Sequence, residues 1–275
     1  MQTIVFVGAG SMAEAIIAGM VKKAVIHPKK LFVMNKGDDK RLFSLQQKYG
    51  ISIVCEQRDA LKKADLVVLA TKPQDIHQAM LDISPFLNRS SAVLSVIAGI
   101  SIKTIAKGLG ARPIARAMPN TSATIGKSAT GIAFNHTVDA ILETQLLTLM
   151  NAIGLVQQVD EPDLHTVTAL SGSGPAYVYY LVEAFEEVAI QKGLSPDIAR
   201  SLIIQTLEGA TAMLKETREE PAILRENVTS PNGTTAAGLQ ALADGDFKKI
   251  IANCIEKASE RSEELALATC KMKQS

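Results

Sequence analysis

The sequence predicts an α/β fold: an N-terminal doubly wound parallel sheet followed by an all-helical region. Three observations support this prediction. Short apolar runs alternate with helical patterns over residues 1–160, as strands and crossover helices do in such sheets. A glycine-rich turn joins the first apolar run to the first helical pattern. Strand patterns then disappear, so we expect a sheet domain over residues 1–160 and a helical domain over residues 161–275.

The composition narrows the class of protein. A length of 275 residues favours two domains. With 29 basic and 28 acidic residues the net charge is +1, so no basic surface indicates nucleic acid or an anionic membrane. Three widely spaced cysteines form no C-x-x-C motif, which indicates a reducing compartment. No run is long and apolar enough to cross a bilayer, and the histidines lack metal-ligand spacing. Because the chain enters the first strand at once, we expect no signal peptide. We therefore expect a soluble cytoplasmic protein without a structural metal.

A strand, a glycine turn and a helix open the chain. The turn consists of Gly8, Ala9, Gly10, Ser11 and Met12. In a G-x-G-x-x-A pattern Gly8 permits the sharp turn, Gly10 lets a pyrophosphate approach the backbone, and Ala13 lets the helix pack on the strand. The free N–H groups at the helix start favour an anion. This context predicts a dinucleotide site of the Rossmann type, the alternative being an ordinary strand–turn–helix.

The coenzyme is predicted from the end of the second strand, residues 31–34. NAD-specific folds usually place Asp or Glu there to bind the ribose hydroxyls. This chain has Asn35 and Lys36, with Lys40 and Arg41 close behind. A neutral amide with nearby cations suits a 2′-phosphate, which favours NADPH over NADH. The alternative is that these cations are only the solvated start of a helix, because two acidic residues lie among them.

Further cofactor contacts are expected at the ends of later strands, since the carboxyl ends of parallel strands face the ligand crevice. Strands are predicted at residues 51–54, 66–70, 92–97, 114–117, 130–134 and 155–159, with a polar helix over 57–64 and a helix capped by Thr137 between the last two. The candidates at the strand ends are Ala70, Thr71, Lys72, Pro73, Ala98, Gly99 and Asn120. Lys72 could instead be a solvated loop lysine, and Asn120 a turn asparagine.

The helical region contains one segment that needs a partner. A helical segment over residues 164–170 is expected to be interrupted at 171–175, and residues 176–192 are apolar on nearly every side. Such a helix is buried in a core or in an interface. A small helical domain offers little core, so a second subunit is the expected cover. Farther on, the polar stretch 227–238 leads into a helix whose N–H groups could hold a small carboxylate. A capped helix after a turn at residues 230–231 is the simpler alternative.

Five motifs occur in the order found in the pyrroline-5-carboxylate reductase family, which the chain resembles over essentially its whole length. They are residues 8–12, 70–73, 116–120, 170–177 and 228–235. The last two are more specific than the nucleotide fingerprint. The resemblance implies reduction of the cyclic imine 1-pyrroline-5-carboxylate to L-proline, the last step of proline biosynthesis, with NADPH or alternatively NADH. It also implies an interleaved helical homodimer, often assembled into larger rings, with substrate pockets shared between subunits.

The resemblance also implies roles for individual residues. The substrate loop comprises Asn227, Val228, Thr229, Ser230, Gly233, Thr234 and Thr235. The N–H groups of Gly233 and Thr234 are expected to hold the substrate carboxylate, and the Thr235 hydroxyl, the catalytic candidate, to bond the ring nitrogen. Glu161 is expected at the pocket rim and Gln57 near the adenine. Asn232 replaces the first of two glycines in relatives, and Asn tolerates the left-handed backbone well.

Two alternative functions remain. β-Hydroxyacid dehydrogenases also have a nucleotide domain followed by helices, but with a catalytic Lys and Asn downstream of a glycine-rich helix start. Here residues 171–175 are followed by tyrosines, and the first later lysine is Lys192. The second alternative is a non-enzymatic relative that keeps the fold, and Asn232 is the substrate-loop feature that favours it.

Overall fold

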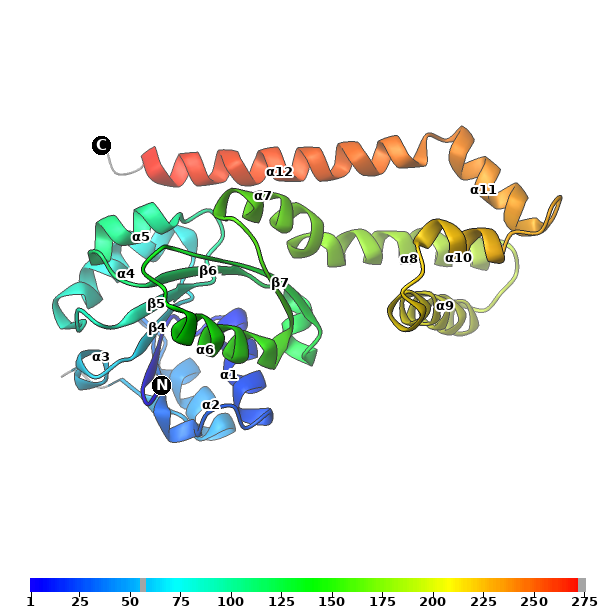
Figure 1. Cartoon of the computed structure of the whole chain (residues 1–275). Coiled ribbons are helices and arrows are strands. Elements are labelled where there is room, and N and C mark those ends of the chain that lie inside the picture. Colours follow the sequence, from blue (N-terminus) through cyan, green and yellow to red (C-terminus); the bar gives the residue numbers. More distant parts are fainter. Residues whose placement is uncertain (55–57, 272–275) are drawn as a thin grey trace. The chain divides into compact units, whose positions relative to one another are not determined.

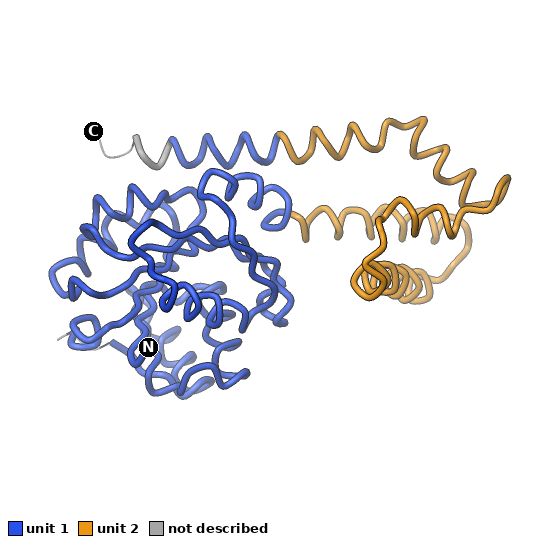
Figure 2. The backbone as a smooth tube through the Cα atoms, in the orientation of Figure 1, with its two compact units in different colours: residues 1–173, 257–275 blue, residues 174–256 orange. Residues whose placement is uncertain are grey.

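The computed structural model describes residues 1–54 and 58–271 (Figure 1). Gln57, expected near the adenine, therefore lies outside the described residues. The chain divides into two compact units, residues 1–173 with 257–275, and residues 174–256 (Figure 2). The first unit holds the sheet, and the second is helical.

The first unit is built on an eight-stranded sheet in the order β3-β2-β1-β4-β5-β6-β7-β8. The strands are β1 (Ile4–Val7), β2 (Leu31–Met34), β3 (Ser52–Ile53), β4 (Leu66–Leu69), β5 (Ala92–Ser95), β6 (Ile114–Met118), β7 (Ser128–Phe134) and β8 (Gly154–Gln158). Neighbours run parallel except β6 and β7, which pair antiparallel. This is the predicted doubly wound sheet of the Rossmann type. Its strand order reverses between β1 and β4, the position at which such sheets bind ligands.

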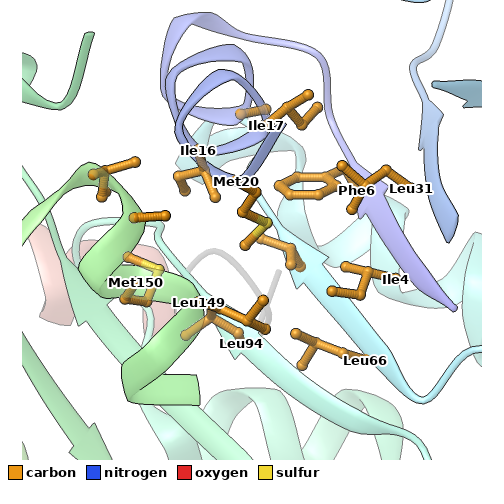
Figure 3. Close-up of a cluster of buried hydrophobic side chains, with 14 of the residues drawn as sticks. Ile4, Phe6, Ile16, Ile17, Met20, Leu31, Leu66, Leu94, Leu149 and Met150 are labelled. Atoms are coloured by element: carbon orange, nitrogen blue, oxygen red, sulfur yellow. The ribbon is translucent and has the colours of Figure 1, made fainter. Parts of the chain in front are cut away.

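Alternating side chains of the strands form two cores, one on each face of the sheet. On β1, Ile4 and Phe6 enter one cluster, and Val5 and Val7 enter the other, because successive residues of a strand point to opposite faces. Figure 3 shows the first cluster, which Met20 completes from the helix above. Apolar burial on both faces explains why the central strands read as uninterrupted apolar runs.

Helices cover both faces of the sheet. They are α1 (Ser11–Lys22), α2 (Asp39–Tyr49), α3 (Asp59–Lys62), α4 (Ile76–Ile83), α5 (Ile102–Leu109), α6 (Ala140–Met150) and α7 (Leu164–Val167). The predicted cap of α6 is wrong. Asp139 is the capping residue, accepting from the Leu142 N–H over 2.8 Å, whereas the Thr137 hydroxyl donates to the Arg112 carbonyl. Asp139 immediately precedes the helix, so its carboxylate reaches a first-turn amide.

The expected interruption at residues 171–175 is also wrong. The helix does not stop after α7 but continues through a π-helical turn, Thr168–Gly172. The Ser173 N–H closes that turn on the Thr168 carbonyl over 2.8 Å, and α8 begins at Gly174. The wider turn absorbs the small residues without ending the helix, and such turns are frequent at functional sites.

The second unit is a set of helices with few buried side chains. They are α8 (Gly174–Gln191), α9 (Pro196–Thr217), α10 (Pro221–Asn227), α11 (Thr234–Asp244) and the first part of α12 (Phe247–Lys271). Within α8 no residue is buried, and Tyr180 is 74% exposed. Leu202 of α9 is 57% exposed. Apolar exposure on this scale is typical of a surface that binds another protein chain, a membrane or a ligand.

The last part of α12 returns to the first unit. The Ser262 hydroxyl is buried and lies 2.9 Å from Nδ1 of His165 in α7. One turn later, the backbone of Ala266 lies 3.5 Å from the place that a side chain at Gly99 would take. Two segments far apart in sequence therefore complete the same unit.

Candidate functional site

The glycine turn between β1 and α1 has the geometry of a phosphate-binding turn. Gly8 has φ +108°, and a Cβ there would lie 2.5 Å from the Ala70 carbonyl oxygen, so only glycine fits. At Gly10, by contrast, a Cβ would meet no heavy atom within 4 Å. Gly10 is the N-cap of α1, and no side chain caps that helix. Its first N–H groups therefore face the open side of the turn, where an anion would be stabilised.

A cleft of about 1100 Å³ opens in front of this turn. Of the predicted cofactor residues, those lining the cleft are Gly8, Ala9, Gly10, Ser11, Asn35, Lys36, Ala70, Thr71 and Lys72. The residues that do not line it are Met12, Pro73, Ala98, Gly99 and Asn120. The ends of β1, β2 and β4 thus meet in one cleft at the point where the strand order reverses.

Thr71 offers the cleft a polar group without a protein partner. Its Oγ1 is buried and makes no hydrogen bond within the described part of the chain. Buried hydroxyls are normally paired. The unpaired Thr71 hydroxyl and the open turn at Gly10 together favour a dinucleotide site over the alternative of an ordinary strand–turn–helix.

Arg41, Glu14 and Lys48 form an ion-pair cluster at the side of the cleft, and of these the sequence pointed only to Arg41. Arg41 lines the cleft, and its Nε donates to the Ala9 carbonyl over 2.9 Å, while Nη2 donates to Oε2 of Glu14 over 2.5 Å. The other oxygen of Glu14 accepts from Lys48 Nζ at 2.9 Å and from the Tyr49 hydroxyl at 2.8 Å. The Lys48 hydrogen bond above all, with those from Arg41 and Tyr49, lowers the pKa of Glu14 to about 2.

Arg58 and Asp38 also line the cleft, although the sequence did not assign either to the site. Arg58 has a left-handed backbone, φ +50°, and its guanidinium donates to the Asp82 carbonyl and lies 4.9 Å from the Phe86 ring centre. Asp38 lines the cleft and caps α2 through a 2.9 Å bond from the Arg41 N–H. Asp before a helical pattern is a cap signature. No comparable pattern points to Arg58.

Asn120 lies outside the cleft and is engaged with protein groups. It is 8% exposed. Its Nδ2 donates to the Ser171 carbonyl over 2.9 Å, and its Oδ1 accepts from the Ser122 N–H over 3.1 Å. The side chain thereby ties the end of β6 to the π-helical turn.

Glu161, predicted at the substrate rim, also has protein partners. Its Oε1 accepts from the Ile102 N–H at 2.7 Å and from Arg116 Nη1 at 2.8 Å. The Arg116 side chain is 9% exposed and that of Glu161 is 30% exposed. Glu161 thus stabilises the start of α5 and neutralises a buried guanidinium, with its second oxygen left for other contacts.

The predicted substrate loop lies in the second unit, between α10 and α11. Asn227 ends α10, and the Thr229 hydroxyl donates to the Arg225 carbonyl over 2.6 Å. Asn232 has φ +59°, so it adopts the left-handed conformation that this residue type was expected to tolerate. The helix begins at Thr234 after Gly233 as N-cap, and no side chain caps it.

This open helix start bears on the alternative that residues 230–231 cap α11. Ser230 accepts the Gly233 N–H through its backbone carbonyl over 3.1 Å, and its side chain does not serve as the cap. The Gly233 carbonyl accepts from Ala237, so the amides of Thr234 and Thr235 precede the first helical hydrogen bond. They are donors that a small anion could use. Val228, earlier in the loop, is 67% exposed.

Two classes of feature are absent from the residues that the structure describes. No helix there has the length and apolarity needed to cross a lipid bilayer. Nor do three or more His, Cys, Asp or Glu side chains converge there as metal ligands would.

Comparisons with known proteins match both parts of the chain. The family described as "Pyrroline-5-carboxylate reductase dimerisation" matches residues 161–265, and the one described as "NADP oxidoreductase coenzyme F420-dependent" matches residues 3–99. Pyrroline-5-carboxylate reductase 2 of Bacillus subtilis (strain 168) is 40% identical over 266 residues, covering 96% of this chain and 95% of that protein.

Solved structures agree with the sequence comparison. A pyrroline-5-carboxylate reductase from Coxiella burnetii has a TM-score of 0.90 at 35% identity, covering 96% of this chain and 98% of that one. Plasmodium falciparum pyrroline carboxylate reductase, solved with NADP bound, has a TM-score of 0.85 at 27% identity over 96% and 98% of the two chains. By fold, by the motifs quoted above and by identity along nearly its whole length, the chain belongs to the pyrroline-5-carboxylate reductase family.

Proposed function

We propose that this chain reduces 1-pyrroline-5-carboxylate to L-proline, the last step of proline biosynthesis, with NADPH bound in the cleft. The observation that carries the proposal is the 40% identity to a pyrroline-5-carboxylate reductase over 96% of the chain. The ranges matched by the two family models, residues 3–99 and 161–265, include the nucleotide turn and the substrate loop. The identity favours an enzyme over a relative that keeps only the fold, and it disfavours a β-hydroxyacid dehydrogenase.

The cleft residues bind and orient the coenzyme. The start of α1, where no side chain caps the N–H groups of Ser11 and Met12, would hold the pyrophosphate. The Thr71 hydroxyl, which lacks a protein partner among the described residues, bonds a ribose or the nicotinamide amide, with Lys72 beside it. When bound, the reduced nicotinamide supplies the hydride that adds to the imine carbon.

NADPH is the proposed coenzyme rather than NADH. Asn35 and Lys36 line the cleft at the end of β2, where an NAD-specific fold would carry an acid that binds the ribose hydroxyls. Lys36 offers a positive charge to a 2′-phosphate at that end. The NADP named in the Plasmodium falciparum structure is in line with this preference.

The substrate is held by the start of α11. The free N–H of Thr234 binds its carboxylate, a small anion suited to an uncapped helix start. The Gly233 N–H, proposed as the second donor, would have to share its present bond to the Ser230 carbonyl. The Thr235 hydroxyl is the catalytic group: it hydrogen-bonds the ring nitrogen as that atom changes from imine to amine. Asn227, Val228, Thr229 and Ser230 shape the loop around the ring. A protonated imine is the better electrophile, so the chain need not supply a dedicated acid.

The remaining assignments stay predictions. Ala98 and Gly99 are proposed beside the nicotinamide, Asn120 at its carboxamide, and Glu161 at the substrate rim. Asn120 and Glu161 already form hydrogen bonds to protein groups. Each would therefore contact the ligand through its remaining donor or acceptor positions, or would act by positioning its neighbours.

A homodimer is the proposed working form. The helices of the second unit expose apolar side chains such as Tyr180 and Leu202, and the family matched over residues 161–265 is described by dimerisation. Covering these faces with a second copy would bury them. Rings of such dimers, and substrate pockets shared between subunits, are the further expectations.

A direct assay tests the function. Purified protein should oxidise NADPH when 1-pyrroline-5-carboxylate is added, with a larger kcat/KM than for NADH. Thr235→Ala should lower kcat about tenfold or more, the scale of one lost transition-state hydrogen bond, and leave NADPH affinity within about twofold. Thr144→Ala is the matched control, because its exposed hydroxyl bonds only its own helix.

Three results would overturn parts of the proposal. No NADPH oxidation at saturating substrate would overturn the reductase activity. Loss of coenzyme binding in Thr235→Ala would overturn the role of Thr235 at the substrate. A larger kcat/KM with NADH would overturn the coenzyme preference alone.

A further inference from the structure

We propose that Arg41 selects the coenzyme by binding its 2′-phosphate, and that Glu14 is the positioning residue that holds the Arg41 guanidinium in place. This rests on the proposed function only in that the cleft binds a nicotinamide dinucleotide. Asn35 and Lys36, the residues expected from the strand-end pattern, would then share this task with a residue on α2.

The guanidinium of Arg41 is fixed at two points and open at the rest. A guanidinium carries five N–H donors in one plane. Nε donates to the Ala9 carbonyl and Nη2 to Glu14 Oε2, which leaves three donors without a partner among the described residues. The side chain is 30% exposed and lines the cleft. A planar fork with free donors matches the oxygens of a phosphate.

Glu14 cannot readily turn away from Arg41, because its other oxygen is held as well. Oε1 accepts from both Lys48 and Tyr49. The carboxylate is therefore fixed from two sides, and the guanidinium plane is set before a ligand arrives. A side chain ordered in advance loses less freedom on binding, which favours affinity.

The charges around Arg41 leave this wall positive. Glu14 is paired with both Arg41 and Lys48, and Asp38 and Lys36 line the same end of the cleft. Counted together, Lys36, Arg41 and Lys48 against Glu14 and Asp38 leave this group of side chains with one excess positive charge. The nearby Arg58 points its guanidinium to the Asp82 carbonyl and the Phe86 ring. Arg41 and Lys48 lie on α2, the helix that follows the strand whose end faces the adenine ribose in such folds.

The alternative is that Arg41 serves the pyrophosphate, because Ala9 belongs to the glycine turn. Comparing NADP⁺ with NAD⁺ separates the two, since both have the pyrophosphate and only one has the 2′-phosphate. We expect Arg41→Gln to weaken NADP⁺ binding about 10- to 100-fold, the scale of a lost charge-assisted hydrogen bond. Its NAD⁺ affinity should change less than about threefold.

The measurement is isothermal titration calorimetry with each oxidised coenzyme and, as a fragment pair, with 2′-AMP and 5′-AMP. Lys40→Gln is the matched control: Lys40 precedes Arg41, is exposed, and does not line the cleft. Arg41→Lys keeps the charge, but a lysine cannot donate to both the Ala9 carbonyl and Glu14 as the guanidinium does. Its NADP⁺ affinity should therefore fall between those of the wild type and Arg41→Gln. Equal weakening of NADP⁺ and NAD⁺, or equal effects of Lys40→Gln and Arg41→Gln, would overturn the proposal.

Glu14→Gln distinguishes a positioning role of Glu14 from a purely electrostatic effect of its negative charge on the bound phosphate. If Glu14 only repelled phosphate, removing its charge would tighten NADP⁺ binding. If it positions Arg41, binding weakens, and we expect a loss of about three- to tenfold for NADP⁺ with NAD⁺ nearly unchanged. Tighter NADP⁺ binding would refute the positioning role.

Binding is measured without turnover, so the two proposals can fail separately. A protein that binds NADP⁺ through Arg41 but does not reduce 1-pyrroline-5-carboxylate would keep this inference and lose the proposed function. A reductase whose NADP⁺ affinity is indifferent to Arg41 would do the reverse.

Discussion

The side-chain Nδ2 of Asn120 donates a 2.9 Å hydrogen bond to the carbonyl oxygen of Ser171. This bond joins the end of β6 to a π-helical turn, whose wider hydrogen-bond pattern closes through Ser173 and Thr168. Asn120 is nearly buried, so water cannot easily replace the amide. The bond therefore fixes the start of the motif at residues 170–177, which is one of the two most specific motifs of the family resemblance.

Asn120→Asp should destabilise the first unit by about 1–3 kcal/mol, because it sets a carboxylate oxygen against the Ser171 carbonyl. The acceptor for the Ser122 N–H is kept. Urea unfolding measures the loss. Asn88→Asp is the control: its exposed side chain accepts from Ser90 in a similar turn, and its effect should stay within about 0.5 kcal/mol. Equal effects at the two positions would show that the Ser171 contact contributes little.

Glu161→Gln should lower the free energy of unfolding by about 1–3 kcal/mol, because Arg116 is almost buried and would lose its counter-charge. The exposed Arg261–Glu264 pair provides a comparison, for which Glu264→Gln should cost about 0.5 kcal/mol or less. The KM for 1-pyrroline-5-carboxylate decides whether Glu161 also contacts substrate. A large rise in KM at unchanged stability would favour the rim over the structural role.

Stability should decrease as the pH is lowered through the titration range of Glu14. The pKa of Glu14 is about 2 in the folded chain against 4.5 for an unperturbed glutamate, so the unfolded state binds more protons between these values. The stabilisation is complete above pH 4.5 and is lost as the pH falls toward 2. Glu14→Gln should flatten this part of the profile, and Tyr49→Phe, which removes one donor, should shift it partly. A variant profile parallel to wild type down to pH 2 would contradict the low pKa.

The left-handed backbone at Asn232 predicts an ordered series of substitutions. Asn232→Gly should leave stability within about 0.5 kcal/mol, while Asn232→Ala should cost about 1 kcal/mol, because φ is +59°. Thermal unfolding and the substrate KM of both variants provide the measurement. If alanine is tolerated as well as glycine in both assays, the loop does not depend on this conformation.

The two glycines of the nucleotide turn should respond oppositely to alanine. A Cβ at Gly8 would collide with the Ala70 backbone, whereas one at Gly10 meets only open space. Gly8→Ala should therefore fail to fold or melt much earlier, and Gly10→Ala should keep wild-type stability within about 0.5 kcal/mol. Calorimetry should nevertheless show weaker NADP⁺ and NAD⁺ binding by Gly10→Ala, since its methyl group occupies the pyrophosphate approach. Unchanged binding by this variant would place the ligand elsewhere.

Features set by local sequence could be predicted. The strands follow from apolar runs between turn residues, and the glycine turn follows from a pattern in which each small residue has a steric reason. Asn232 in a left-handed turn is a property of the residue type itself. These features lie within a few residues of the signals that predict them.

The missed features depend on contacts between distant segments. The Arg41–Glu14 pair joins residues 27 apart, and Glu161 reaches an arginine 45 residues away. No spacing rule links such positions. The π-helical turn was hidden for another reason: glycine and serine at residues 171–174 are typical of a break, and the bond from Asn120 is among the contacts that hold them in a helix instead.

The return of α12 to the first unit has a consequence for biogenesis. Residues 257–275 belong with residues 1–173, and the buried Ser262 meets His165 there. A ribosome makes every helix of residues 174–256 before it makes this last piece. The first unit therefore cannot be completed during synthesis until the second unit has been made. A fragment that ends at residue 173 would lack the helix segment that covers part of its surface.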